Sequence, residues 1–139
     1  MYLIDTNVIS ESRKRSKANS GVRAFFKRVA TEDGRVFISV VTVGELRRGV
    51  ELIRHRGDHR QARQLEKWLD QLLVDYEDRV LDITADIAQL WGRLRVPHPE
   101  NALDKQIAAT ALIYDLTVVT HNHKVFSKTG AQLLNPFDE

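Results

Sequence analysis

Short apolar runs alternate with segments of helical spacing along this chain. Strand-like runs occur at 2–4 (YLI), 35–41 (RVFISVV), 79–83 (RVLDI) and 116–120 (LTVVT). Apolar positions three and four residues apart predict helices over 20–30, from Thr42 to a break at 56–59, over 62–73, over 87–94, and from a cap at Asn101 to Leu112. Strands that alternate with helices are typical of an α/β fold, so we expect a mainly parallel sheet flanked by helices.

Two further features bear on the organisation of the chain. The tail AQLLNPF (131–137) is compatible with an edge strand, and the stripe of Leu65, Trp68, Leu69 and Leu72 is compatible with either core or a dimer interface. The 139 residues contain no internal repeat and no low-complexity segment. We therefore expect a single domain over residues 1–139.

Charge and composition narrow the class of protein. The formal net charge is only +2, but seven basic residues and no acid lie between Ser12 and Arg28, and a second basic group spans 47–63. Such clusters suit either phosphate backbones or a solvated helix face. The chain has no cysteine, which excludes thiolate metal sites, and it has no apolar run near the ~20 residues that span a bilayer. Its first residues lack the pattern of a signal peptide, so we expect a soluble, cytoplasmic protein without membrane contact.

Polar side chains follow the strand-like runs at the points where the strands are expected to end. Asp5 follows YLI, Ser39 lies within the second run, and Thr120 closes the last one. In open α/β sheets, functional sites form beyond the carboxyl ends of the strands. Asp5 could belong to such a site, although Asp followed by Thr and Asn also makes an ordinary Asx-turn that leaves a strand.

Two more acids fall at expected helix starts. Glu45 lies three residues after Thr42, which is also the spacing of a capping box, in which the carboxylate would bond the Thr42 backbone N–H. Asp104 lies three residues after Asn101, where a negative charge favours the helix dipole. Asp104 also lies on the stripe of Ile107 and Ala108, so it points inward and needs a partner, a proton or a metal.

Taken together, these acids predict a metal site. Asp5, Glu45 and Asp104 should converge at one edge of a parallel sheet, where their charges would raise one another's pKa. A divalent cation relieves this repulsion, and oxygen ligands favour Mg²⁺, with Mn²⁺ as a substitute. Such a cation can assist hydrolysis of a phosphodiester.

Four blocks of sequence resemble the PIN-domain ribonucleases. They are LIDTNVISE at the start, ISVVTVGELRRGV (38–50), LDKQIAATA (103–111) and VVTHNHKVF (118–126). More narrowly, they are similar to VapC toxins of bacterial toxin–antitoxin pairs, in the FitB-like branch. The resemblance implies a three-layer PIN fold with a central parallel sheet of about five strands between helices.

The resemblance also implies a Mg²⁺-dependent endoribonuclease and roles for particular residues. The family's first three acids fall on Asp5, Glu45 and Asp104 as catalytic residues and metal ligands, and the fourth position, often Asp, falls on Asn122. Asn122 would then orient water. The polar residues that support the acids fall on Thr6, Asn7 and Thr120. Basic residues near the cleft would hold the RNA backbone, and we name Arg13, Lys14, Arg47 and Arg48.

Partners follow from the same resemblance. It implies a homodimer, a toxin–antitoxin hetero-oligomer in which a basic tail of the cognate antitoxin enters the acidic site, and contact with operator DNA through the antitoxin. The alternative is a catalytically weak PIN module that acts mainly as the antitoxin's partner in an operator-binding repressor complex. Retention of all three acids favours the enzyme.

Other functional classes fit the sequence less well. It contains no GxxxxGK[ST] phosphate loop and no G-x-S-x-G elbow, which argues against a nucleotide hydrolase and an α/β-hydrolase. A dehalogenase-type phosphatase or a receiver domain would require a further acid near Asp5, where Asn7 stands instead. His55 and His59 have the spacing of a zinc pair on a helix, but Gly57 interrupts that helix.

Overall fold

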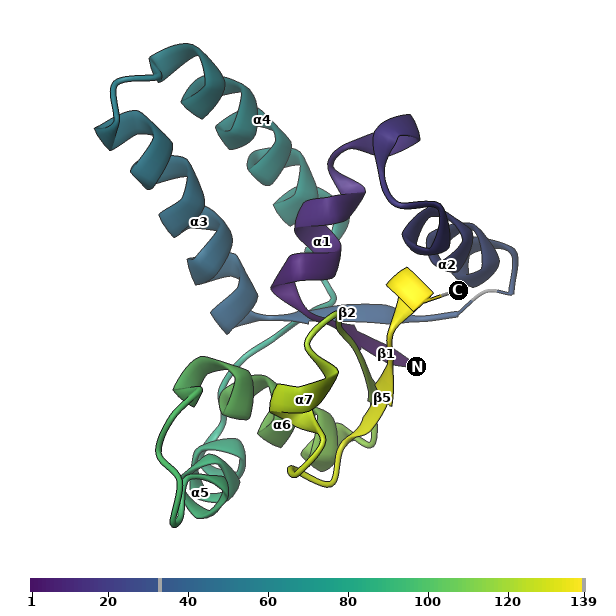
Figure 1. The fold of residues 1–139 in the computed structure, drawn as a ribbon, viewed down its shortest axis with the longest axis vertical. Helices are drawn as coiled ribbons and strands as arrows, with labels where there is room; N and C mark the ends of the chain where they lie inside the picture. Colours follow the sequence, from purple (N-terminus) through teal and green to yellow (C-terminus); the bar gives the residue numbers. More distant parts are fainter. Residues whose placement is uncertain (33, 139) are drawn as a thin grey trace.

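Five short parallel strands form the centre of the molecule in the computed structural model, which describes residues 1–32 and 34–138 (Figure 1). They are β1 (Tyr2–Ile4), β2 (Val36–Ser39), β3 (Val80–Leu81), β4 (Thr117–Val119) and β5 (Gln132–Leu134), in the order β3-β2-β1-β4-β5. Tyr2 pairs with Val36 on one side and with Thr117 on the other. Every neighbouring pair is parallel, so the carboxyl ends of all five strands lie at one edge.

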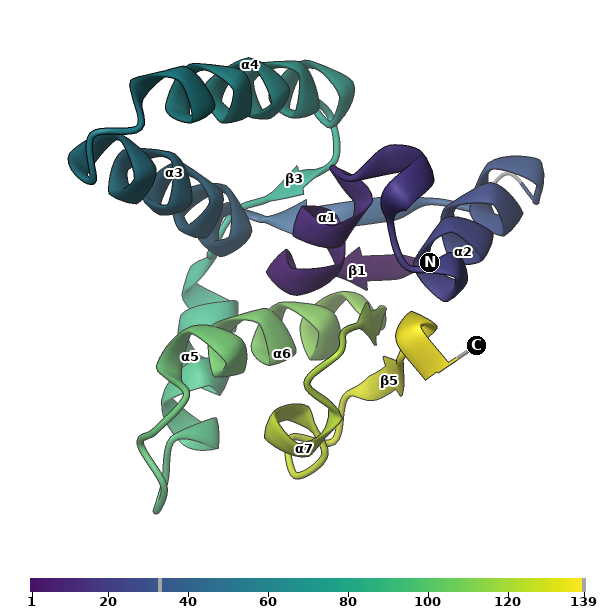
Figure 2. The same ribbon diagram turned by 45° about the horizontal axis from the view of Figure 1, so that its top comes forward.

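The helices cover both faces of this sheet (Figure 2). They are α1 (Thr6–Ser12), α2 (Ser20–Thr31), α3 (Val40–His55), α4 (His59–Asp75), α5 (Ala85–Leu94), α6 (Ala102–Tyr114) and α7 (His123–Phe126), with short 3₁₀ turns at Arg15–Lys17 and Pro136–Asp138. The architecture confirms the expected three-layer α/β fold. None of the helices in the described parts of the chain is both long and apolar enough to cross a bilayer.

Alternation along β1 separates two hydrophobic cores, because successive strand residues point to opposite faces. Ile4 packs with buried residues of α1 to α4, such as Phe25 and Leu69. Leu3 packs on the other face with Ile107 of α6 and Phe126 of α7. The central strand is therefore buried on both sides, as its continuous apolar run requires.

The stripe on α4 belongs to the first core. Leu69 and Leu72 are buried there, and Leu65 and Trp68 pack against the same cluster. The α3–α4 pair extends away from the sheet as a helical hairpin, visible at the upper left of Figure 1. Of the two alternatives for this stripe, core packing is the one that the structure supports.

Three local expectations differ from the structure. The strand predicted over 35–41 ends at Ser39, because the Ser39 hydroxyl accepts a hydrogen bond from Val41 N (3.0 Å) and starts α3 there. Thr42 consequently lies inside the helix, so the Thr42–Glu45 capping box is wrong. Helix α1 was not predicted, since its seven residues span only about two turns and carry too few positions for a periodic signal.

Candidate acidic active site

Asp5 occupies the junction between β1 and α1. Its backbone N–H donates to Val119 O of β4 (2.9 Å), and its Oδ1 accepts from Thr6 N (2.8 Å), which makes it the N-cap of α1. The residue is only 2% exposed. The Asx-turn alternative was close to this arrangement, but the chain continues into a helix. Backbone groups thus hold both parts of Asp5: Val119 O bonds its N–H, and Thr6 N bonds its carboxylate.

Two side chains tie the other Asp5 oxygen to β4. Asp5 Oδ2 accepts from Asn7 Nδ2 (3.0 Å) and from Thr120 Oγ1 (2.8 Å). Asn7 Oδ1 in turn accepts from His121 N (3.1 Å), and Thr120 Oγ1 accepts from Asn122 N (2.9 Å). The polar residues expected to support the acids therefore surround Asp5 directly.

Glu45 reaches the same place from α3. Its Oε1 accepts from Thr6 Oγ1 (2.8 Å), which also lies 3.1 Å from Thr42 Oγ1. Glu45 is half-buried, and its pKa is raised, first by burial and then by the charge of Asp5, against the lowering effect of the Thr6 hydrogen bond. Thr6 thus sits between two catalytic candidates: its N–H holds Asp5 and its hydroxyl holds Glu45.

Asp104 approaches from the first turn of α6. Burial, and then the charges of Asp5 and Glu45, raise the pKa of Asp104 to about 6. The pKa of Asp5 is also raised, by burial that outweighs its three hydrogen bonds. The charges of the three acids therefore act on one another, as the sequence predicted, and no cationic side chain of the described residues forms an ion pair with them.

Asn122 is held through its backbone and not through its side chain. It precedes α7 and is exposed, and its side chain makes no capping hydrogen bond. Its backbone N–H bonds to Thr120, which places it next to Asp5. The amide is thus available to contact a substrate or water.

The donor set suits a hard cation in its chemistry, although it does not form a closed cage. Within residues 1–32 and 34–138, no group of three or more His, Asp or Glu side chains is arranged to hold a metal ion. Asp5 accepts three hydrogen bonds, which leaves about one of roughly four carboxylate lone-pair positions open. Glu45 Oε2 and both Asp104 oxygens accept no hydrogen bond from the described residues. These open carboxylate oxygens are the kind of ligand that Mg²⁺ prefers.

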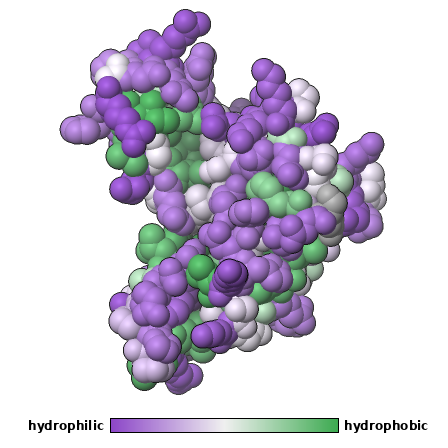
Figure 3. All heavy atoms as spheres, in the orientation of Figure 1, coloured by the Kyte–Doolittle hydropathy of each residue, from purple (hydrophilic) through white to green (hydrophobic). Residues whose placement is uncertain are grey.

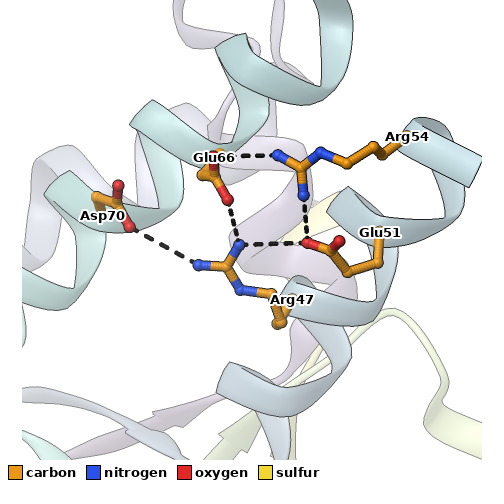
Figure 4. A network of polar contacts seen from close by, with 5 residues as sticks. All are labelled: Arg47, Glu51, Arg54, Glu66 and Asp70. Carbon is orange, nitrogen blue, oxygen red and sulfur yellow. Dashed lines mark hydrogen bonds and ion pairs between the residues drawn. The ribbon is translucent and has the colours of Figure 1, made fainter. Parts of the chain in front are cut away.

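Two of the four basic residues named for RNA binding are engaged within the protein. Arg47 bonds Glu66 Oε2 of α4 (2.7 Å) and Glu51 Oε2 (3.5 Å), as Figure 4 shows. Lys14 bonds Glu11 Oε1 (2.9 Å). Arg13 and Arg48 are exposed. The positive charges of Arg47 and Lys14 are therefore partly neutralised within the protein, which weakens their attraction for RNA phosphates.

The fold and the acidic edge place this chain in a known family. A family model described as the PIN domain matches residues 2–132, and the chain belongs to this family. This finding confirms the resemblance drawn from the sequence.

Particular relatives narrow the comparison. The chain is 32% identical to Toxin FitB of Neisseria gonorrhoeae over 145 aligned residues, which cover 100% of both proteins. It is 28% identical to VapC ribonuclease Y4jK of Sinorhizobium fredii, with 99% of each covered. Among solved structures, FitAB bound to an IR36 DNA fragment superposes with a TM-score of 0.83 at 31% identity, covering 99% of this chain and 96% of that one.

One group of residues near the site was missed in the sequence. Lys105, Lys124 and Lys128 line a cavity at the first turn of α6, the turn that carries Asp104. They are separated along the chain from the two basic clusters at 12–28 and 47–63. The only sequence signal for these lysines is that Lys105 directly follows Asp104 and that Lys124 lies two residues after Asn122.

Proposed function

We propose that this protein is a Mg²⁺-dependent endoribonuclease of the VapC type, a toxin that a cognate antitoxin neutralises. The observation that carries the proposal is the convergence of Asp5, Glu45 and Asp104, three acids with raised pKa values, at one edge of a PIN sheet. The names of the relatives, Toxin FitB and a VapC ribonuclease, support the same activity. A nuclease that cleaves cellular RNA acts in the cytoplasm, which is the compartment that we propose.

The proposed chemistry assigns a separate task to each residue. Asp5 and Asp104 would hold the cation directly, and Glu45 would help to position the cation or the water beside it. When bound, Mg²⁺ neutralises charge that develops on the scissile phosphate and lowers the pKa of water beside it. Asp5 provides a fixed anchor because Thr6, Asn7 and Thr120 restrain both of its oxygens.

Glu45 and Asn122 would act on the water and the substrate. Thr6 restrains Glu45 Oε1, so Glu45 Oε2 is free to accept a proton from the attacking water. The exposed Asn122 amide would orient that water or a phosphate oxygen. Hydrolysis then breaks one P–O bond of the RNA, and the leaving oxygen takes up a proton from solvent.

The comparisons also support particular partners. FitAB, which this chain resembles along nearly its whole length, is bound to DNA in its structure. By analogy, we propose that this chain forms a homodimer, combines with a small antitoxin, and reaches operator DNA through that antitoxin.

The second candidate is a PIN module with weak catalysis that serves mainly as the antitoxin's partner. Two features favour it: the open arrangement of the acids in the described chain, and Asn122 at the position where the family resemblance implies a fourth acid. A calorimetric Mg²⁺ titration that compares the wild type with Asp104→Asn separates the two. Tighter binding by the wild type supports the enzyme, whereas equal binding supports the module.

The decisive experiment is incubation of the purified protein with total RNA in Mg²⁺ and in EDTA. We expect cleavage only in Mg²⁺, with loss in Asp5→Asn and in Asp104→Asn. Asp82→Asn, at an exposed acid that follows β3, is the matched control and should cleave normally. Wild-type cleavage by Asp5→Asn with an unchanged fold would refute the assignment.

A further inference from the structure

A cavity of about 320 Å³ opens between the end of α5, the connection 95–101, α7 and the first turn of α6, which carries Asp104. Its charged lining includes Lys105, Lys124, Lys128, His98 and Glu100. The space-filling view shows that the molecule is notched between the α3–α4 hairpin and the part formed by α5 to α7 (Figure 3). The cavity belongs to the second of these parts.

The lysines of this cavity lack the acidic partners that Arg47 and Arg54 of α3 have. Lys105 is buried, only 9% exposed, and its ammonium donates to the His98 carbonyl, which uses one of its three donors. Within the described chain, no carboxylate lies within ion-pair distance of Lys105, Lys124 or Lys128. The one acid in the lining, Glu100, lies 3.6 Å from His98 Nδ1. A buried cation without a counter-charge favours an anion in the adjoining space.

The start of α6 adds to the same preference. Asn101 adopts a left-handed conformation (φ 58°), and its side chain makes no capping hydrogen bond. The first N–H groups of this 13-residue helix are therefore not capped by Asn101, and the positive end of its dipole lies at the cavity. The partial positive charge of the helix end therefore adds to the positive charge of the lysines in this cavity.

The position of the cavity connects it to the acids at two points. Asp104 and Lys105 are consecutive on α6, so they project about 100° apart around the helix, Asp104 toward the acids and Lys105 toward the cavity. Asn122, bonded through Thr120 to Asp5, lies two residues before Lys124. The cavity is thus connected to the acids through α6 and through the segment that leads into α7, and an RNA strand that follows this surface would bring a neighbouring phosphate to the lysines.

We propose that this lysine-lined cavity binds the phosphate of the RNA strand adjacent to the cleaved bond. The inference deepens the proposed ribonuclease function and rests on it. The cavity carries three cations against one acid, whereas Arg47 and Lys14, the alternatives named from the sequence, are paired with carboxylates. The lysines would fix the register of the strand without reading its sequence.

The test measures RNA binding without turnover. A fluorescently labelled single-stranded RNA is titrated in EDTA, over a range of salt, with the wild type and with Lys124→Gln/Lys128→Gln. Both lysines are exposed, so the fold should persist, whereas Lys105 is too buried to be a safe target. We expect binding about five- to tenfold weaker at low salt, and a slope of log K against log salt that is smaller by about 0.7 for each phosphate that the variant no longer neutralises.

The matched control is Lys17→Gln/Lys27→Gln, which removes the same charge from exposed positions next to and on α2. A smaller effect of this pair supports a specific role of the cavity. Equal weakening by both pairs would show only general attraction and would overturn the inference. Unchanged binding by Lys124→Gln/Lys128→Gln would overturn it as well.

A second arm locates the bound phosphate on the RNA. Neutral methylphosphonate linkages are placed one at a time along the oligonucleotide. One linkage should weaken binding by the wild type but not by Lys124→Gln/Lys128→Gln, and a result in which no linkage behaves in this way contradicts phosphate binding in the cavity. If the wild type neither binds nor cleaves RNA, the proposed function itself fails, which is a different outcome from normal RNA binding by the lysine variants.

Discussion

The Thr120 hydroxyl donates a 2.8 Å hydrogen bond to Asp5 Oδ2, across a sequence separation of 115 residues. Both residues are buried at the ends of adjacent parallel strands, β1 and β4. This contact couples the geometry of the first acid to the pairing of the two central strands.

Loss of this hydroxyl should affect both stability and activity. Thr120→Val leaves a buried carboxylate with one donor fewer, so we expect the free energy of unfolding to fall by about 1–3 kcal/mol in urea titrations. The pKa of Asp5 should rise further, because the Thr120 hydrogen bond lowers it in the wild type. When pH is lowered, RNA cleavage by Thr120→Val should therefore begin to decline at a higher pH than cleavage by the wild type. Thr117→Val, on the same strand but less buried, is the control and should have a smaller effect.

Thr6 should matter through its hydroxyl. Thr6→Val removes the 2.8 Å hydrogen bond to Glu45, whereas Thr6→Ser keeps a hydroxyl at that position. We expect Thr6→Val to lose about 10- to 100-fold in cleavage rate or Mg²⁺ affinity, as is typical when a partner of a metal ligand is removed. Thr6→Ser should stay close to the wild type. Wild-type activity in Thr6→Val would contradict a role of the hydroxyl, and a similar loss in both variants would indicate that the site needs the methyl group as well.

The raised pKa of Asp104 predicts a pH-dependent stability in the absence of metal. The folded-state pKa is about 6 against an ordinary value of 3.8, so the folded protein binds this proton more tightly than the unfolded chain does. The stabilisation of the fold by protonated Asp104 is complete below about pH 3.8 and is lost as pH rises through about 6. Asp104→Asn should therefore be more stable than the wild type at pH 7.5 in EDTA, by about 1–2 kcal/mol after allowance for solvent screening.

Chemical denaturation at several pH values measures this effect. The advantage of Asp104→Asn should shrink as pH is lowered from 7.5 to 4, and Mg²⁺ should raise the melting temperature of the wild type more than that of the variant. Asp82→Asn, at an exposed acid, should show neither trend. An advantage that does not change with pH would rule out ionisation of Asp104 as its source.

The ion pairs between α3 and α4 should stabilise the helical hairpin and should not contribute to RNA binding. Glu66 joins Arg47 (2.7 Å) and Arg54 (3.0 Å), so Glu66→Gln weakens two contacts at once (Figure 4). We expect a small decrease in the urea midpoint that disappears at high salt, because exposed pairs are screened. Asp70→Asn is the control, since Asp70 lies 3.8 Å from Arg47 and is largely exposed. RNA binding should not fall in Glu66→Gln, and a loss of binding there would contradict the structural role of the pair.

The approach of the three acids to one edge of the sheet could be predicted from the sequence, because strand ends and helix starts carry strong local signals. Asp5 follows a buried apolar run, and a parallel sheet brings every such end to one edge, so the meeting of Asp5 with the acids of α3 and α6 followed from topology. Thr6, Asn7 and Thr120 were expected to support the acids, and each of them bonds Asp5.

Features were harder to predict where two local preferences oppose each other, or where a residue's partner is distant in sequence. Val40 and Val41 have β-branched side chains typical of strands, but the Ser39 cap turns them into the first turn of α3. Arg47 was named for RNA because it is basic and close to Glu45, although the acids that pair with it from α4 are far along the chain. Neither secondary-structure propensity nor closeness in sequence identifies ion-pair partners that lie on another helix.

The uncompensated repulsion among Asp5, Glu45 and Asp104 has a consequence for control of the enzyme. Any positive group that enters this edge is stabilised by the same electrostatic field, whether it is a dissolved ion or a side chain delivered by another polypeptide. A guanidinium or ammonium group bound among the three carboxylates should therefore displace the Mg²⁺ ion of the proposed hydrolysis. Inhibition by a basic peptide would then be competitive with magnesium, and excess magnesium would restore cleavage.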